Sequence, residues 1–191
     1  MTRDLNNRLD QILPKVISKD FLAGKGLGNE IGFWIFDYLP QDELAIRKHI
    51  DHLMVQIHMQ SPGLRVANVN LLGLLVDYLK DRKLLDKAID MQITRGNEAL
   101  LKALEAPLHG KNLAGFIARR YPLQNLDLML MSGVGSAFPL VRSHSLLNNL
   151  HPVMGETPLV LFYPGVYDGQ SLSLFGKIKQ DNYYRAFKLV P

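Results

Sequence analysis

Cysteine is absent from the 191 residues of this sequence. Its absence excludes disulfide bonds, thiolate metal sites and cysteine nucleophiles. Long apolar runs are lacking too, since no segment approaches the roughly 18 uninterrupted apolar residues that a membrane-spanning helix needs. The first 25 residues carry charges throughout, unlike the apolar centre of a signal peptide. We therefore expect a cytoplasmic protein that does not enter a membrane.

Motifs of familiar enzyme classes are also missing. The chain contains neither Gly-x-Ser-x-Gly nor His-Glu-x-x-His. The segment from Gly24 to Gly28 is rich in glycine and contains a lysine, but it precedes a predicted strand, whereas a phosphate loop follows one. His49 and His52 lie three residues apart on a predicted helix without a third ligand. We therefore predict that the protein is not an enzyme and has no metal site and no cofactor.

The charge balance is only weakly basic. The formal net charge is +4, and Met1 to Val76 contains eight basic and eight acidic side chains, so the whole surplus lies in the later part of the chain. A clustered basic stripe there would indicate nucleic-acid binding. However, Lys80, Arg82, Lys83 and Lys87 alternate with aspartates, which predicts a helix face laced with salt bridges.

The strongest structural signal is the apolar run from Leu159 to Tyr163, which is typical of a strand buried on both faces. Pro158 and Pro164 bound it. Further strands are predicted by similar runs at residues 32–38, 64–69 and 126–131. Each of these is followed by a turn and by apolar residues at helical spacing. The chain therefore repeats strand, loop and helix.

This repeat predicts an α/β fold, with a mostly parallel sheet and helices on both faces. We expect it to be Rossmann-like or P-loop-like, without a phosphate loop. Residues 71–121 read as helical throughout, a longer crossover than one parallel connection requires. We treat them as a helical insertion within a single domain of residues 1–191, which either covers one face of the sheet or protrudes as a lobe. Residues 172–175 and 183–189 predict a hairpin at the edge of the sheet.

Polar residues and glycines follow several predicted strands. Because parallel strands end at the same edge of a sheet, these residues should converge in one crevice. They are Asp37, Tyr38, Asn70, Ser132, Gly133, Gly135 and Tyr163. Asp37 could serve there as a base or a metal ligand, although an aspartate that caps a helix or bonds a tyrosine is commoner.

The segment from Ser132 to Ser136 is the most suggestive part of this crevice. Its glycines would let backbone amides face a ligand at the start of a helix. This predicted helix has Pro139 in its first turn and extends to about Leu150. The predicted anion-binding residues are Ser132, Gly133, Gly135, Ser136 and Arg142. The alternative is steric, because a tight strand-to-helix turn demands glycine without any ligand.

The last third of the chain is rich in aromatic residues. Large aromatic and arginine side chains suit a protein interface, although they suit a core equally well. In the predicted last strand both faces mix large and polar residues, as in an edge strand that a partner covers. The predicted partner-binding residues are Tyr167, Tyr183, Tyr184, Arg185 and Phe187.

Several strings, in their order along the chain, resemble the BrxB family of the BREX (bacteriophage exclusion) systems of bacteria and archaea. They are Gly28-Asn29-Glu30, the aromatic run from Phe33 to Pro40, the glycine turn from Ser132 through Pro139 to Arg142, Leu146 to Leu150, Pro158 to Gly165, Ser171 to Gly176 and Asn182 to Phe187. The resemblance covers nearly the whole chain. No string departs from the family pattern.

This resemblance implies a core component of an antiviral defence system, acting beside a PglZ-type phosphatase-like protein, a PglX-type adenine methyltransferase and a BrxC-type ATPase. It suggests a non-catalytic adaptor that binds the PglZ-type protein first and meets DNA mainly through the complex. Two alternatives stay open. One is a sensor module that binds a nucleotide or another phosphate ligand, and the other is an accessory DNA-binding subunit.

Overall fold

The computed structural model describes residues 3–24, 32–180 and 186–191, and it confirms the predicted α/β class. A row of parallel strands forms the centre of a seven-stranded sheet. In sheet order these strands are β2 (Val66–Asn70), β3 (Leu128–Ser132), β4 (Leu159–Tyr167), β1 (Phe33–Tyr38) and β7 (Phe187–Lys188). Two short antiparallel strands, β5 (Leu172–Leu174) and β6 (Ile178–Gln180), extend from the far end of β4. Antiparallel additions of this kind are common at the edges of otherwise parallel sheets.

Helices cover both faces of the sheet, which explains why its central strands are apolar throughout. All five residues of β3 are buried. Successive residues of β1 and β4 enter opposite cores: Ile35 and Leu161 belong to one, Phe36 and Phe162 to the other. The period of two in a strand thus divides its side chains between two hydrophobic clusters.

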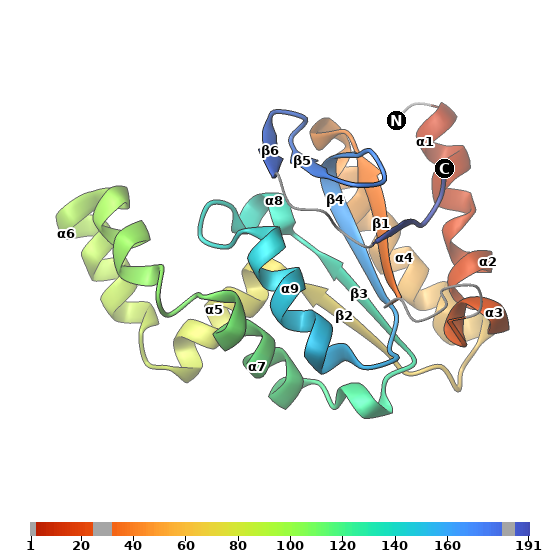
Figure 1. Cartoon of the computed structure of the whole chain (residues 1–191), viewed down its shortest axis with the longest axis horizontal. Helices are drawn as coiled ribbons and strands as arrows, with labels where there is room; N and C mark the ends of the chain where they lie inside the picture. The colour runs from red at the N-terminus through yellow and green to blue at the C-terminus, as the bar shows by residue number, and fades with distance from the viewer. Residues whose placement is uncertain (1–2, 25–31, 181–185) are drawn as a thin grey trace.

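The chain connects these layers in a simple order (Figure 1). The face that contains Phe36 is covered by α1 (Arg3–Asp10), α2 (Ile12–Val16), α3 (Lys19–Leu22) and α4 (Glu43–Gln60), the last preceded by a 3₁₀ turn, η1 (Pro40–Asp42). The face that contains Ile35 is covered by α5 (Leu71–Asp81), α7 (Gly110–Arg120), α8 (Val134–Ala137) and α9 (Ser143–Met154), with a second 3₁₀ turn, η2 (Leu123–Asn125), before β3. The predicted buried stripe of α4 is confirmed, because Ile46, Ile50, Leu53 and Ile57 are all buried.

The crossover between β2 and β3 both covers the sheet and protrudes from it. Asn70 caps α5 as predicted, since its side-chain oxygen accepts a hydrogen bond from the Gly73 amide at 3.1 Å. Between α5 and α7 lies α6 (Leu85–Leu104), which extends away from the body of the molecule (Figure 1). Only Ala88 and Leu104 of α6 are buried. We call α6 the arm.

Two local predictions were wrong. The helix predicted across Pro139 does not form: α8 ends at Ala137, and α9 begins only at Ser143. Phe138 is extended, as the residue before a proline prefers, so the helix stops there. The predicted hairpin of residues 172–175 and 183–189 is also different, because β5 pairs with β6, whereas β7 lies parallel to β1. Residues 181–185 lie outside the described part of the chain.

Candidate functional site

The polar ends of the parallel strands do lie along one edge of the sheet. The strand register places Asn70 beside Ser132, and Asp37 beside Tyr163. However, β4 continues past this edge and turns into β5 and β6, which lie over the strand ends in Figure 1. Of the side chains predicted to face a ligand, Asp37, Tyr38 and Asn70 are hydrogen-bonded within the fold.

Asp37 forms the centre of a network that joins distant segments. The Arg8 guanidinium donates to its carboxylate at 2.7 Å and to its backbone oxygen at 2.9 Å. The Tyr167 amide donates to the second carboxylate oxygen at 3.0 Å. The Lys188 ammonium lies 3.9 Å from that same oxygen. Since these contacts satisfy the buried carboxylate, Asp37 acts in the structure as a tie between α1, β1 and β4.

A second chain of polar contacts crosses the same edge and reaches the predicted anion turn. The Tyr38 hydroxyl donates to Glu43 at 2.5 Å, and Arg47 donates to Glu43 at 2.8 Å and to the Ser136 hydroxyl at 2.9 Å. Burial, reinforced by the Glu43 carboxylate, holds the pKa of Tyr38 well above its usual value. The Ser136 hydroxyl thus accepts a hydrogen bond from Arg47 near the start of α4, a contact that no local sequence pattern predicts.

Steric demands account for both glycines of this turn. Gly133 has a φ of +76°, and a Cβ there would lie 2.9 Å from the Asn70 amide nitrogen. A Cβ on Gly135 would lie 2.9 Å from the Phe175 ring and 3.0 Å from the Pro164 ring.

The helix that follows, α8, has only four residues, so its dipole would attract an anion only weakly. The steric alternative therefore explains the glycines without a ligand.

Arg142 lies in a different place from the one predicted for it. It precedes α9 and lines a hollow of about 450 Å³ between that helix and the start of α7. Lys102, His109 and His144 line the same hollow, with Glu105 as the acidic side chain among them. Burial, and to a lesser extent the nearby Arg142 charge, lowers the pKa of His144.

The predicted partner-binding residues fall into three groups. Tyr167 is fully buried, and its hydroxyl donates to the Ala186 carbonyl at 2.6 Å, so it holds the C-terminal segment rather than facing solvent. Phe187 is half-buried and packs against Trp34, with 5.2 Å between ring centroids. Tyr183, Tyr184 and Arg185 lie outside the described residues.

The arm presents apolar side chains to solvent. Ile93 is 78% exposed and Ile89 is 45% exposed, one helical turn apart. Gly96, with φ of +80° and ψ of 179°, breaks the helix and reverses the chain just beyond them. Exposed apolar residues grouped on a protruding element are typical of protein interaction sites. The sequence carried a signal for this surface, namely an apolar pair in a crossover longer than a parallel connection needs.

Features that would indicate metal chemistry or membrane insertion do not appear in the described ranges. Within residues 3–24, 32–180 and 186–191, no group of three or more His, Asp or Glu side chains is arranged to hold a metal ion. None of the helices described is long and apolar enough to cross a membrane. His49 and His52 lie on α4, where burial and the proximity of His52 lower the pKa of His49.

Comparisons with known proteins point to one family. The sequence profile of the family described as BREX protein BrxB matches residues 67–189. A BREX protein BrxB from Bacillus cereus (strain H3081.97) is 43% identical over 192 residues, covering 98% of both chains. Another from Escherichia coli O9:H4 (strain HS) is 42% identical over 187 residues, covering 98% of this chain and 92% of that relative. No solved structure gives a significant match.

Proposed function

The chain belongs to the BrxB family of BREX proteins, and from this premise we propose that it is a non-catalytic adaptor that assembles the components of its BREX system. Membership in the family makes the protein a BREX component, consistent with an antiphage role. The polar groups at the strand ends fit this proposal, because the hydrogen bonds of Asp37, Tyr38 and Ser136 join elements of the fold to one another.

The observation that carries the proposal is the exposed pair Ile89 and Ile93 on the arm. An isoleucine left in water forgoes about 2 kcal/mol that its burial would contribute. The arm makes few contacts with the rest of the fold, since 18 of its 20 residues are not buried. A partner that covers this pair would recover the burial free energy, so the arm is the docking element of the adaptor.

The first partner that we propose is the PglZ-type protein of the same BREX system. The resemblance of this chain to its family names that protein as the neighbour of BrxB, and a rigid projecting helix pair suits insertion into a groove of a larger protein. The PglX-type methyltransferase and the BrxC-type ATPase are the other components that the adaptor would bring together. DNA would reach the adaptor mainly within that assembly.

Recovery of the tagged subunit from cells that express the complete BREX cluster tests this function. We expect the PglZ-type protein to co-purify with the wild-type subunit. Replacing Ile93 by Glu puts a charge into the proposed interface, and loss of about 2 kcal/mol would weaken association about 30-fold. The double variant Ile89→Glu/Ile93→Glu should lose the PglZ-type protein from the recovered complex.

Met59→Glu is the control for exposure alone, because Met59 is 69% exposed and lies one helical turn after Val55, which is 55% exposed. This second apolar pair is on α4, which packs on the opposite face of the sheet instead of projecting from the fold. The control introduces the same charge and should recover the same proteins as the wild type. Thermal unfolding of all variants should stay at the wild-type temperature, since none of the three side chains is buried. Absence of any BREX component from the wild-type sample would refute the adaptor function.

A further inference from the structure

A basic groove lies between α7 and the turn that joins α5 to the arm. It has a volume of about 300 Å³. Its walls are formed by Tyr78, Arg82, Leu84, Pro107, Lys111, Asn112, Gly115 and Arg119. Three of these residues are cationic and none is acidic. The groove is distinct from the apolar pair on the arm.

The three cations are available to a ligand. Arg82, Lys111 and Arg119 are exposed, and none of them forms an ion pair with another residue in the described part of the chain. The neighbouring Arg120 differs, because it pairs with Asp77 at 2.9 Å. The salt-bridged helix face predicted for Lys80, Arg82, Lys83 and Lys87 is wrong for the described residues. The helix is interrupted there, since α5 ends at Asp81 and α6 begins at Leu85, and none of these four cations forms an ion pair with a neighbouring aspartate.

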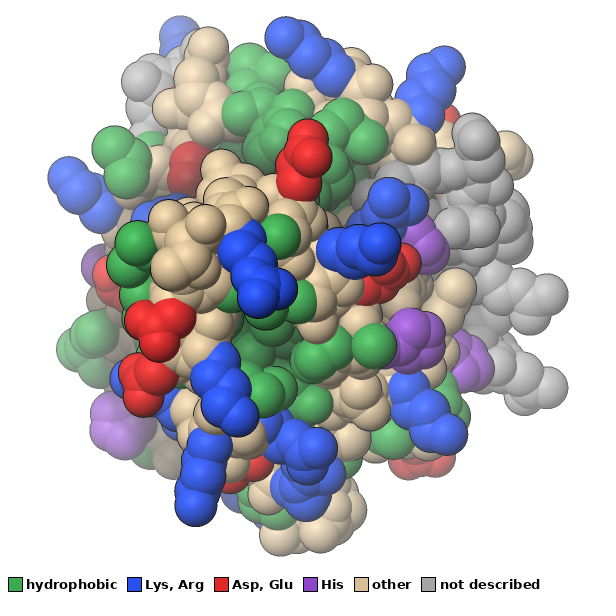
Figure 2. Space-filling model, turned by 90° about the vertical axis from the view of Figure 1, so that its left-hand side faces the viewer, with side chains coloured by type: hydrophobic (Ala, Val, Ile, Leu, Met, Phe, Trp, Pro, Cys, Tyr) green, Lys and Arg blue, Asp and Glu red, His purple; other side chains and the backbone are tan. Residues whose placement is uncertain are grey.

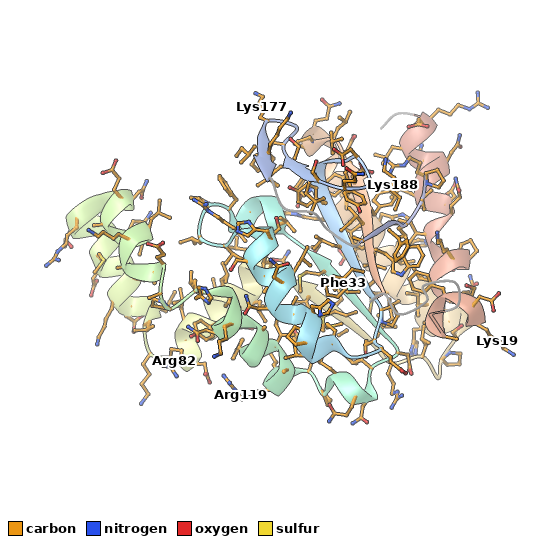
Figure 3. All side chains as sticks on the ribbon, in the orientation of Figure 1. Lys19, Phe33, Arg82, Arg119, Lys177 and Lys188 are labelled. Carbon is orange, nitrogen blue, oxygen red and sulfur yellow. The ribbon has the colours of Figure 1, made fainter. Side chains whose placement is uncertain are left out.

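Two of the cations lie along one helix, and the third faces them from the opposite wall. Lys111, Gly115 and Arg119 are spaced by four residues, so they share one face of α7. The Arg119 guanidinium folds back over Gly115, where a Cβ would lie 3.8 Å from its Nη1 atom. Arg82 contributes from the opposite wall, at the end of α5, where the chain reverses through Lys83 with a φ of +54°. Figure 3 shows Arg82 and Arg119 projecting from the same side of the molecule.

The surrounding surface is basic as well. Residues 71–121 contain nine Lys and Arg against six Asp and Glu, which supplies most of the net charge of +4. On the face turned to the viewer in Figure 2, Lys and Arg side chains outnumber Asp and Glu side chains and are spread over the upper and lower halves. A second hollow at the start of α7 contains Lys102 and Arg142 together with Glu105.

We propose that this groove binds the phosphodiester backbone of a nucleic acid. Lys111 and Arg119 are eight positions apart, which corresponds to about 12 Å along the helix. Phosphates follow one another every 3.4 Å or so along the axis of a DNA strand, so one strand can reach Lys111 and Arg119 together, whereas a free phosphate cannot. An acidic protein would need carboxylates in an equally dense row. Because all three cations are long, exposed side chains, we assign their contacts to the phosphates, which makes the binding independent of sequence.

Fluorescence anisotropy with the purified full chain tests this site. The probes are a labelled duplex DNA of random sequence, the corresponding single strand, and a poly-glutamate of matched charge. Three phosphate contacts predict that duplex binding weakens about 40-fold between about 50 and 200 mM salt. The triple variant Arg82→Gln/Lys111→Gln/Arg119→Gln should lose most of this binding and most of its salt dependence.

A second triple variant separates the groove from bulk charge. Arg95→Gln/Lys177→Gln/Lys179→Gln removes the same number of charges from exposed positions elsewhere, and Lys177 lies at the opposite end of the molecule from Arg119 (Figure 3). This variant should bind DNA like the wild type. The charge-preserving variant Arg82→Lys/Lys111→Arg/Arg119→Lys should also retain binding, which guards against loss through misfolding.

The outcomes divide clearly. Tighter binding of the duplex or of the single strand identifies the preferred nucleic acid, and either result supports the site. Equal losses in the two Gln triples, equal binding of poly-glutamate, or no binding by the wild type at low salt would overturn it. Failure of DNA binding would leave the docking role of the arm untouched, because Ile89 and Ile93 do not line the groove.

Discussion

Asp37 shows how a single carboxylate can hold together parts of a chain that are far apart in sequence. It accepts hydrogen bonds from Arg8, which lies 29 residues before it, and from the amide of Tyr167, which lies 130 residues after it. Arg8 also donates to the carbonyl of Pro191 at 3.1 Å. The first helix, the central strands and the C-terminus are thus linked through two side chains.

Replacing Asp37 by Ala should lower the free energy of unfolding by about 2 to 3 kcal/mol, because it leaves the Tyr167 amide unsatisfied and the half-buried Arg8 without its partner. Denaturant unfolding measures this change. In a double-mutant cycle with Arg8→Ala, the two residues should show a coupling of about 1 kcal/mol. Strictly additive effects would show that the ion pair does not contribute as described.

Gly133 provides a second test at the scale of one residue. Alanine at this position should cost about 1 to 2 kcal/mol, because the left-handed backbone disfavours a Cβ and because Asn70, the cap of α5, must move. Gly63→Ala is the matched control, since Gly63 has no atom within 4 Å of its Cβ position. Equal melting temperatures for the two variants would contradict the steric explanation of the turn.

The sequence could place these residues but could not supply their partners. Asp37 and Gly133 were both predicted at strand ends, and both lie there. Their contacts depend on which strand lies beside which and on where β4 turns, and no local pattern encodes such long-range pairing. For the same reason, the glycines of the turn suggested an anion site. Their steric cause, the side chains of Asn70 and Phe175 that lie against them, could not be predicted.

At the scale of elements, the arm differs from every helix that covers the sheet. Only two of its residues, Ala88 and Leu104, are buried against the rest of the protein, so few apolar contacts hold it in place. Its shape depends on Gly96, whose backbone conformation is almost exclusive to glycine. A helical protrusion of this kind opens more easily than the strands, because few tertiary contacts oppose its opening.

Replacing Gly96 by Ala should destabilise the arm without unfolding the core. The strained conformation costs about 1 to 3 kcal/mol, so hydrogen exchange of the arm amides should accelerate by about tenfold or more. The amides of β3 and β4 should exchange as slowly as in the wild type. Acceleration spread evenly over arm and strands would show that the arm is part of the cooperative core.

The predictability of elements followed the strength of their local signals. Continuous apolar runs identified β1, β3 and β4 because strands buried on both faces need them. The last strand was predicted over residues 183–189; of the described residues in that range, Phe187–Lys188 form β7. Alternation alone does not reveal where a neighbouring strand ends. The arm was foreseen only as one of two options, since helical periodicity does not tell which helices meet the sheet.

At the scale of the whole molecule, the edge of the sheet where many α/β proteins bind ligands is partly covered by strands of the protein itself. In open α/β sheets the crevice at the carboxyl ends of the strands is the usual ligand site. Here the extension of β4 and the β5–β6 hairpin lie over that edge. The two surfaces that we propose for function both lie on helices: the apolar pair of the arm and the basic groove along α7.

The adaptor function is tested most directly by titrating the purified subunit with the purified PglZ-type protein of its own BREX system in a calorimeter. The proposal predicts saturable binding at micromolar concentration or below, weakened about 30-fold or more by Ile89→Glu/Ile93→Glu. Met59→Glu should bind like the wild type. No heat of binding for the wild type, or equal weakening by the arm variant and the Met59 control, would contradict an adaptor that docks through its arm.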